Sequence, residues 1–225
     1  MSPSNHLDNP VWAALSGPHT GHAERYGRSA RYQPEISPFG AVDDPADPRA
    51  WDDLRALTGR GNRALVSAPG ITAPPGWTTE SVPGVQLLGA GYHGAPDPEA
   101  VLLTAGDLPD ILDLVRRTRP GPFGKRTIEL GAYLGIRRDG RLVAMAGERL
   151  RVPGHTEISA VCTDEAYRGA GLATRLIGAV AAGIRARGEV PFLHATAGNV
   201  TAIRLYERLG FSLRTEIRFM AATPD

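Results

Sequence analysis

The stretch that decides the fold is 164–175, DEAYRGAGLATR, which stands directly before a long apolar run. Gly169 and Gly171 carry no side chain that would block the backbone, and Ala173 continues this open surface into the next turn. The N–H groups that open a helix lack intrahelical partners, and the helix dipole adds partial positive charge there. Arg168 adds a full charge. The segment therefore predicts an anion site, and a diphosphate is the ligand that suits it best.

Two other phosphate-binding loops fit this stretch less well. A P-loop requires a lysine followed by Ser or Thr at the start of the helix, and this stretch contains no lysine. The dinucleotide fingerprint GxGxxG/A needs Gly or Ala at position 174, where this chain has Thr174. It also needs an acidic residue at the end of the next strand, and PFLHAT (191–196) ends without one. The pattern that is met is R-x-x-G-x-G/A, with Arg168, Gly171 and Ala173.

The segments around this loop alternate between strand and helix signals. HTEISAVCT (155–163) is a predicted strand, and GLATRLIGAVAAGIRARG (171–188) a helix with an apolar stripe. NVTAIRLYERLG (199–210) is a helix with Asn199 at its N-cap, and a last strand pair is expected around 211–222. Upstream, the expected elements are a strand at 100–105, a helix at 106–121 and a hairpin at 131–150 that turns at RRDGR. This order predicts a mixed α/β fold.

Changes in composition divide the chain into three parts. Residues 1–48 are rich in Pro, Ser, Gly and His, and are expected to form an extended segment that lies over the body without forming a core. Residues 49–98 contain one helix signal and two strand signals, and are expected to form an N-terminal α/β half. Residues 99–225 carry the sharpest patterning and are expected to form the main domain.

Composition excludes several classes of function. A net charge of +1 over 225 residues gives no general basic field for nucleic acid or membrane surfaces. The single cysteine, Cys162, excludes an internal disulfide framework and a CxxC metal site, and His19 with His22 lacks a third ligand, which favours a solvated surface over a metal site. No stretch approaches the roughly 20 apolar residues that span a bilayer, and the first residues lack the pattern of a secretory signal. A cytoplasmic protein without a metal is expected.

With these residues in view, the chain resembles the GNAT superfamily of acyl-CoA-dependent N-acyltransferases over about residues 99–220. VCTDEAYRGAGLATRLI (161–177) is similar to the strand, loop and helix that bind the coenzyme A pyrophosphate, and 193–211 is similar to the second signature, N-x-x-A-x-x-x-Y-x-x-x-G-F. TEISAVCT and PFLHA resemble the FR47-like branch related to glycine N-acyltransferases, in which an extra N-terminal half precedes the catalytic one. The resemblance implies a GNAT fold, with a mixed central sheet splayed at the cofactor strand pair, residues 49–98 as an additional N-terminal α/β half, and residues 99–225 as the catalytic domain.

The resemblance also implies which residues contact the acyl-CoA co-substrate. Main-chain groups of Val161 and Thr163 would bond the pantetheine arm between the splayed strands, and Asn199 would cap the last helix and contact the same region. Tyr206 matches the motif tyrosine, and we expect its hydroxyl to act as the general acid that protonates the leaving thiolate. The full expected set is Val161, Cys162, Thr163, Arg168, Gly169, Ala170, Gly171, Leu172, Ala173, Thr174, Asn199, Ala202 and Tyr206.

The expected catalytic base is Glu157. It stands four residues before Val161 on the same face of the strand, a spacing that matches the strand glutamate used as a base by some family members. A carboxylate half-buried beside the acceptor would have a raised pKa and could take a proton directly or through water. Glu148 and His194 are the remaining candidates for the base, and Cys162 is expected to pack in the core rather than form an acyl intermediate.

The function implied is direct acetyl transfer from acetyl-CoA to the amino group of a small molecule or amino acid, by a monomer or homodimer. Walls of the acceptor site are expected from RPGPFGKRTIEL (119–130) and from the N-terminal half, residues 49–98. A second possible function is that of a regulatory module that binds an acyl-CoA or nucleotide without transferring anything, because no residue pattern marks an amine site. A nucleotide-dependent oxidoreductase is disfavoured by Thr174.

Overall fold

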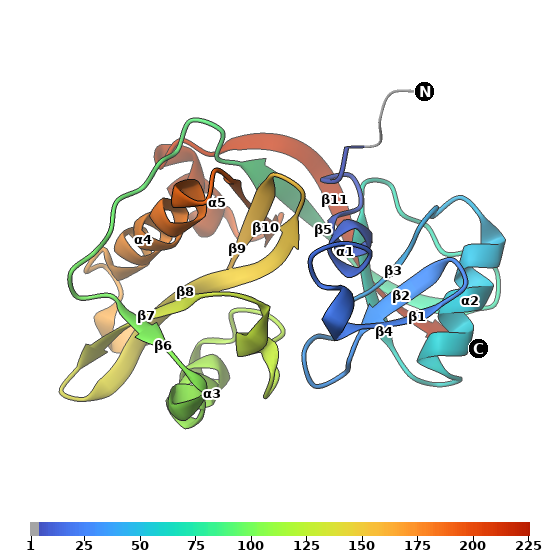
Figure 1. Cartoon of the computed structure of the whole chain (residues 1–225), viewed down its shortest axis with the longest axis horizontal. Helices are drawn as coiled ribbons and strands as arrows, with labels where there is room; N and C mark the ends of the chain where they lie inside the picture. Colours follow the sequence, from blue (N-terminus) through green and yellow to red (C-terminus); the bar gives the residue numbers. More distant parts are fainter. Residues whose placement is uncertain (1–4) are drawn as a thin grey trace.

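The computed structural model describes residues 5–225, which form a mixed α/β fold. The helices are α1 (Pro10–Leu15), α2 (Pro48–Thr58), α3 (Leu108–Thr118), α4 (Leu172–Ala186) and α5 (Val200–Arg208). The strands are β1 (Ala23–Tyr26), β2 (Ser29–Tyr32), β3 (Gly40–Val42), β4 (Ala64–Ala68), β5 (Trp77–Leu88), β6 (Val101–Leu103), β7 (Tyr133–Arg138), β8 (Arg141–Val152), β9 (His155–Thr163), β10 (Val190–Thr196) and β11 (Ser212–Pro224). Their order in space is shown in Figure 1.

An eight-stranded mixed sheet runs through the molecule in the order β4-β11-β5-β10-β9-β8-β7-β6. Strand β5 lies between β10 and β11 and is antiparallel to both. In Figure 1, β5 and β11 bridge the side that carries α4 and α5 and the side that carries β1 to β4. The proposed three-part division of the chain stays a prediction, but strands from residues 49–98 share one sheet with strands from residues 99–225.

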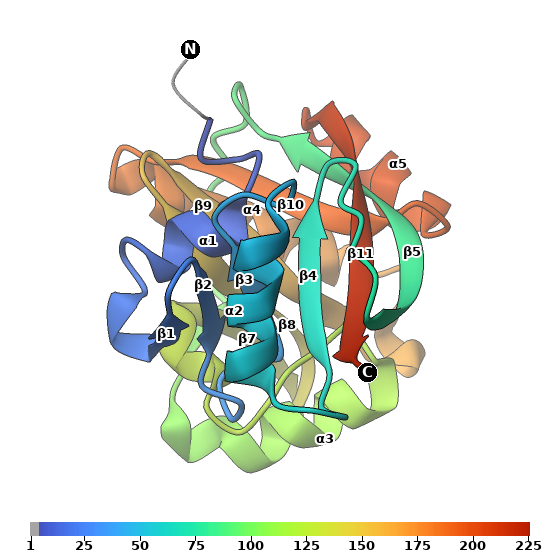
Figure 2. The ribbon, with the colours of Figure 1, turned by 90° about the vertical axis from the view of Figure 1, so that its right-hand side faces the viewer.

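The C-terminal strand differs from the sequence-based expectation. The sequence predicts a strand pair around 211–222, whereas β11 is one continuous strand that pairs with β5 along its length and with β4 in its second half. β11 can remain one long strand because its backbone groups are hydrogen-bonded to β5 along one edge and to β4 along the other. In a hairpin these groups would have bonded to one another. Figure 2 shows β4, β11 and β5 side by side, with α2 next to β4.

The N-terminal segment is part of the core. Apolar side chains of α1, β2 and the β2–β3 connection pack against the main sheet in one buried cluster, which includes Leu7, Val11, Leu15, Tyr32, Ile36, Phe39, Leu150 and Phe192. The expectation that residues 1–48 lie over the body without forming a core is therefore wrong for the described part of that segment. Residues 1–4 of the segment lie outside the described residues.

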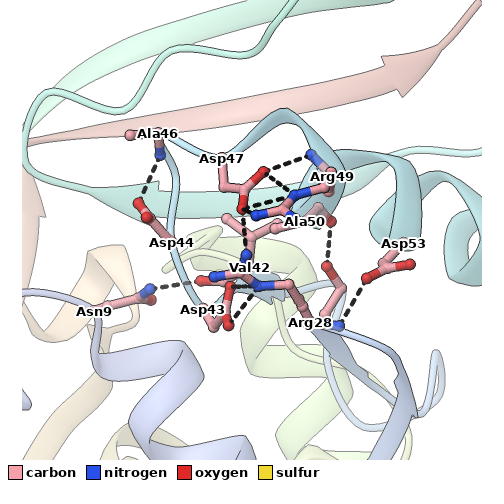
Figure 3. A network of polar contacts seen from close by, with 11 residues as sticks. Asn9, Arg28, Val42, Asp43, Asp44, Ala46, Asp47, Arg49, Ala50 and Asp53 are labelled. Atoms are coloured by element: carbon pink, nitrogen blue, oxygen red, sulfur yellow. Dashed lines mark hydrogen bonds and ion pairs between the residues drawn. The ribbon is translucent and has the colours of Figure 1, made fainter.

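Polar contacts centred on Arg28 hold this N-terminal layer together (Figure 3). The Arg28 guanidinium pairs with Asp47 and lies 2.9 Å from the Asp43 carboxylate, while its main-chain N–H donates to Asp53 at 2.8 Å. Asn9 donates from its side chain to the Val42 carbonyl at 2.7 Å. These bonds join α1, the β1–β2 turn, β3 and the start of α2, so the layer forms one wall that can support a site.

The sheet opens between β9 and β10. These parallel strands pair only at their beginnings, from Val190 opposite His155 to Phe192 opposite Glu157. Beyond this point β9 stays paired with β8 as far as Thr163, and β10 with β5 as far as Thr196, so each strand is bonded on its outer edge. The splayed mixed sheet is thus confirmed, and unpaired backbone edges of β9 and β10 face the gap.

A bulge lies in β9 within the open region. The register shifts between Met145 and Gly147, and Ala160 has a φ of 54°, in the left-handed region. Bulges of this kind leave a residue unpaired and redirect the strand. An alanine in this conformation costs about 1–2 kcal/mol, which the surrounding strands must offset.

Candidate active site

The glycine loop, residues 168–173, joins the end of β9 to α4 through a short 3₁₀ turn, Glu165–Tyr167. Gly169 and Gly171 have φ values of 82° and 74°, and an added Cβ at either would meet no neighbouring atom within 4 Å. In the described structure, the main-chain N–H groups of residues 169–174 have no hydrogen-bond acceptor, and the first bonded amide of α4 is that of Arg175, which donates to the Gly171 carbonyl. The loop is therefore an uncovered set of donors at a helix N-terminus, where an anion binds favourably.

We expect Gly171→Ala to destabilise the protein and Gly183→Ala to stabilise it. Position 171 has a left-handed backbone, which costs an alanine about 1–2 kcal/mol, whereas position 183 is helical and open to a methyl group. Replacing an interior helical glycine by alanine gains about 0.5–1 kcal/mol. Urea unfolding of the two variants measures both changes, and equal effects of the same sign would contradict this account of the loop.

A cavity of about 1060 Å³ extends from the glycine loop along the open edge of β9. Every residue expected to contact the co-substrate lines it except Ala170. Thr163 Oγ1 is buried there without a hydrogen-bond partner among the described residues. Buried polar atoms are nearly always bonded, so this hydroxyl is an exception within the lining. The structure thus brings the predicted binding residues together, and their contacts with acyl-CoA stay a prediction.

Tyr206 lies on α5, whose N-cap is Asn199 as predicted, with the Asn199 side chain accepting from the Ala202 N–H at 3.2 Å. The Tyr206 ring packs in the core beneath α4, 8% exposed, and the residue also lines the cavity. Burial raises the pKa of Tyr206 to about 12. The phenol therefore keeps its proton at neutral pH, which an acid must do before it can donate.

Glu157 differs from the half-buried carboxylate that the sequence led us to expect. It is 0% exposed and does not line the cavity. Arg149 donates to it from Nε at 2.8 Å and from Nη2 at 2.6 Å, and His194 Nδ1 lies 2.8 Å from Glu157 Oε1. Burial opposes ionisation, but the charge and hydrogen bonds of Arg149 and the bond from His194 outweigh it and lower the Glu157 pKa to about 2. The expected raised pKa is wrong, because the sequence did not reveal the buried cation.

His194 lies on β10 between Glu157 and Gln86, and it lines the cavity. Gln86 Nε2 donates to the Leu7 carbonyl at 2.9 Å, while Gln86 Oε1 accepts from Arg214 Nη1 at 2.9 Å, which fixes the orientation of the amide. The same amide nitrogen lies 2.9 Å from His194 Nε2. Nε2 must therefore be the acceptor, and Nδ1 carries the proton that is donated to Glu157. In this tautomer the lone pair of the imidazole is at Nε2.

Glu148 and Cys162 are less well placed for catalysis than His194. Glu148 is buried, pairs with Arg187 at 2.9 Å and does not line the cavity. Cys162 is buried in an apolar cluster with α3, and burial raises the pKa of its thiol to about 11. A thiol held protonated in this way is a poor nucleophile.

Sequence reasoning missed Arg149 and the aromatic wall of the cavity. Arg149 reaches Glu157 across the β8–β9 pair, and its guanidinium carbon lies 4.9 Å from the centre of the Phe39 ring. Phe39 and Phe219, from the two ends of the chain, both line the cavity. The sequence did contain a signal for this ion pair, because Arg149 and Glu157 carry opposite charges on two adjacent strands of a hairpin. The register shift between Glu148 and Arg151 concealed which residues face each other. The expected wall from residues 119–130 is found at positions 119–122.

Two findings concern metals and membranes. His19, expected on the surface, is buried and lies 2.8 Å from the Tyr32 hydroxyl, and burial with the nearby charges of His22 and Arg151 lowers its pKa to about 4. Within residues 5–225, no three metal-ligating side chains come together as a metal site would require. Among the helices of the same residues, none combines the length and the apolar character needed to cross a bilayer.

Comparisons with known proteins agree with this geometry. The FR47-like protein family matches residues 133–220. A protein from Novosphingobium aromaticivorans DSM 12444, described as an acetyltransferase of the GNAT family, is 39% identical, with a TM-score of 0.91 over 99% of this chain and 100% of its own. The comparison with curated proteins found no match.

More distant solved structures share the fold. A GCN5-related N-acetyltransferase from Kribbella flavida has a TM-score of 0.66 at 18% identity, covering 96% of this chain and 94% of its own. A GCN5-related N-acetyltransferase-like protein from Streptococcus suis 89/1591 has a TM-score of 0.54 at 18% identity, covering 96% and 92%. From the whole-length similarity to the Novosphingobium protein, the chain belongs to the GNAT family of N-acyltransferases.

Proposed function

We propose that this protein transfers the acetyl group of acetyl-CoA directly to the amino group of a small molecule or amino acid. One observation carries the proposal: the uncovered N–H groups of the glycine loop open onto a cavity that continues along the splayed strands to Tyr206 and His194. Such a cavity can hold a diphosphate at one end and a thioester and an amine at the other. Arg168, which has no ion-pair partner among the described residues, adds charge at the diphosphate end.

The reaction forms one bond and breaks one. The lone pair of the neutral amine attacks the thioester carbonyl, the carbon–sulfur bond breaks, and an amide and a free thiol result. An amine that binds as the ammonium ion first loses one proton to expose this lone pair. The nitrogen then loses a second proton as the amide forms, and the thiolate gains one, so the site must accept a proton on one side and supply one on the other. Tyr206 supplies it from the hydroxyl that burial keeps protonated.

We assign the proton acceptor to His194, with Glu157 as the residue that positions it. Nε2 carries the lone pair, and the Glu157 carboxylate on Nδ1 holds the tautomer and stabilises the imidazolium that forms. Gln86 Nε2 also donates to the Leu7 carbonyl, so the Gln86 amide stays bonded when the substrate amine takes its place at Nε2 of His194. Glu157 thus remains part of the catalytic arrangement without taking the proton itself.

We expect His194→Gln to lower kcat/KM about 100-fold near neutral pH, within the range for loss of a general base. The loss should narrow as pH rises towards 9, because a growing fraction of the amine is then already neutral. Steady-state thiol release across this pH range measures the effect. His155→Gln, on the same sheet but outside the cavity, is the matched control. A pH-independent loss would remove His194 as the base.

Calorimetry and thiol release together test the proposed function. Acetyl-CoA should bind to the protein, and a panel of primary amines should release free coenzyme A from the complex. Failure of acetyl-CoA to bind at millimolar concentration would refute the proposal. Binding without thiol release for any amine would instead favour a regulatory module that senses acyl-CoA.

A further inference from the structure

The charged side chains that line the cavity all have the same sign. Among the described residues, the lining contains no aspartate or glutamate, and its arginines are Arg119, Arg149, Arg168 and Arg208. Glu157, directly behind Arg149, neutralises that one cation from outside the cavity. A cavity with this charge attracts anions and raises the free energy of bound cations. It should therefore bind polyamines and other polycationic acceptors poorly.

One end of the cavity combines an apolar wall with a single directed donor. Phe39, Leu65 and Phe219 come from the N-terminal layer, β4 and β11, and Arg149 lies at the base of this wall beside the Phe39 ring. Arg149 uses Nε and Nη2 on Glu157. Its third nitrogen, Nη1, has no acceptor among the described residues and is not fully buried. Nη1 is thus the donor that a ligand can reach.

We infer that the acceptor is a monoamine that carries a carboxylate and an apolar or aromatic side group, as an apolar α-amino acid does. This inference rests on the proposed function and assigns the parts of the acceptor. Arg149 Nη1 donates to the carboxylate, and the apolar side group packs against Phe39, Leu65 and Phe219. The amino group then faces His194, which also lines the cavity and whose ring centre lies 6.1 Å from that of Phe219.

The state of Arg149 selects a carboxylate over a phosphate. Two of its three nitrogens are bonded to Glu157, whose carboxylate balances the charge of the guanidinium, so what remains is one N–H donor at Nη1 without a net charge of its own. A singly charged acceptor suits this donor, and a dianion would require a second free cation there. Sites of this kind use few polar groups within apolar walls to fix orientation.

A series of acceptors that differ in one group tests the inference without any mutation. L-Phenylalanine, L-phenylalaninamide and phenethylamine share the ring and the amine, and spermidine represents polycations. We expect kcat/KM for the acid to exceed that for the amide by about 10- to 100-fold, the range for a hydrogen bond between charged groups. The amine of the amide is the less basic of the two, so deprotonation alone would favour the amide. Equal or better turnover of the amide, the amine or spermidine would overturn the inference while leaving acetyl transfer intact.

Two variants locate the carboxylate. Arg149→Lys keeps a cation beside Glu157 but lacks Nη1. It should reduce the ratio of kcat/KM for the acid to that for the amide about tenfold or more, through a higher KM for the acid. Arg119→Gln, on the same cavity lining, should retain that preference. The reverse result would show that Arg149 does not bind the carboxylate.

A binding experiment separates failure of this inference from failure of acetyl transfer. N-acetyl-L-phenylalanine and its amide are titrated into the protein saturated with coenzyme A, where no turnover is needed. Tighter binding of the acid, lost in Arg149→Lys, supports the inference even if no amine is acetylated. Equal binding of the two compounds, or binding of neither, overturns it.

Discussion

Tyr206→Phe should lower kcat about 10³-fold and leave the dissociation constant of acetyl-CoA almost unchanged. The substitution removes one oxygen and keeps the ring that packs against Phe211 and α4. Loss of a general acid costs about 10²–10⁴ in rate, and the pKa of about 12 shows that the phenol is protonated before the reaction begins. Thiol release measures kcat, and calorimetry with acetyl-CoA measures binding.

Tyr92→Phe is the matched control for this variant. Tyr92 also packs against Phe211, at a ring separation of 5.2 Å, and does not line the active-site cavity. It should retain full activity. An unchanged kcat in Tyr206→Phe would assign Tyr206 to the core alone, and an equal loss in both variants would indicate a packing defect.

Arg149→Met should lower the free energy of unfolding by about 3–5 kcal/mol, the cost of removing one partner of a buried ion pair. Glu157 is 0% exposed. In the variant its carboxylate keeps the hydrogen bond from His194 but loses the positive charge of Arg149. The isolated charge must then be desolvated without compensation, or the group must take up a proton. Urea unfolding at neutral pH measures the loss.

The double variant Arg149→Met/Glu157→Gln separates charge from packing. Removing both charges should recover much of the stability, because replacing both members of a buried pair is often nearly neutral. The single variant Arg149→Lys should lose less than Arg149→Met. If the double variant were as unstable as Arg149→Met, the loss would come from the packing of the Arg149 side chain on Phe39.

The parts of the site that depend on local sequence could be predicted, and those that depend on contacts between distant segments could not. Gly169, Gly171 and Asn199 act through the backbone of their own turns, so their positions in sequence already indicated an uncovered helix start and an N-cap. The pKa of Glu157 depends on Arg149, eight residues away across a hairpin whose register shifts. That shift is a property of the folded sheet, and no residue pattern marked it.

The same distinction holds for the fold. The order of helices and strands after residue 99 followed from periodicity, turns and caps, whereas the place of β5 between β10 and β11 did not. Gln86, on β5, reaches His194 only because of this placement. The core contribution of residues 5–48 was also missed, because the short apolar runs of that segment are buried only by partners far along the chain.

The position of β5 has a consequence for how the chain reaches its native state. Trp77 pairs with Pro224, and the Thr78 hydroxyl donates to Asp225 across a separation of 147 residues. During synthesis, β5 must wait for β10 and β11 to leave the ribosome before it can dock. Contacts at such separations slow folding and leave strand edges exposed. The aromatic wall that carries Phe219 is thus assembled only after β11 has been synthesised, and the site cannot form on a nascent chain that lacks this strand.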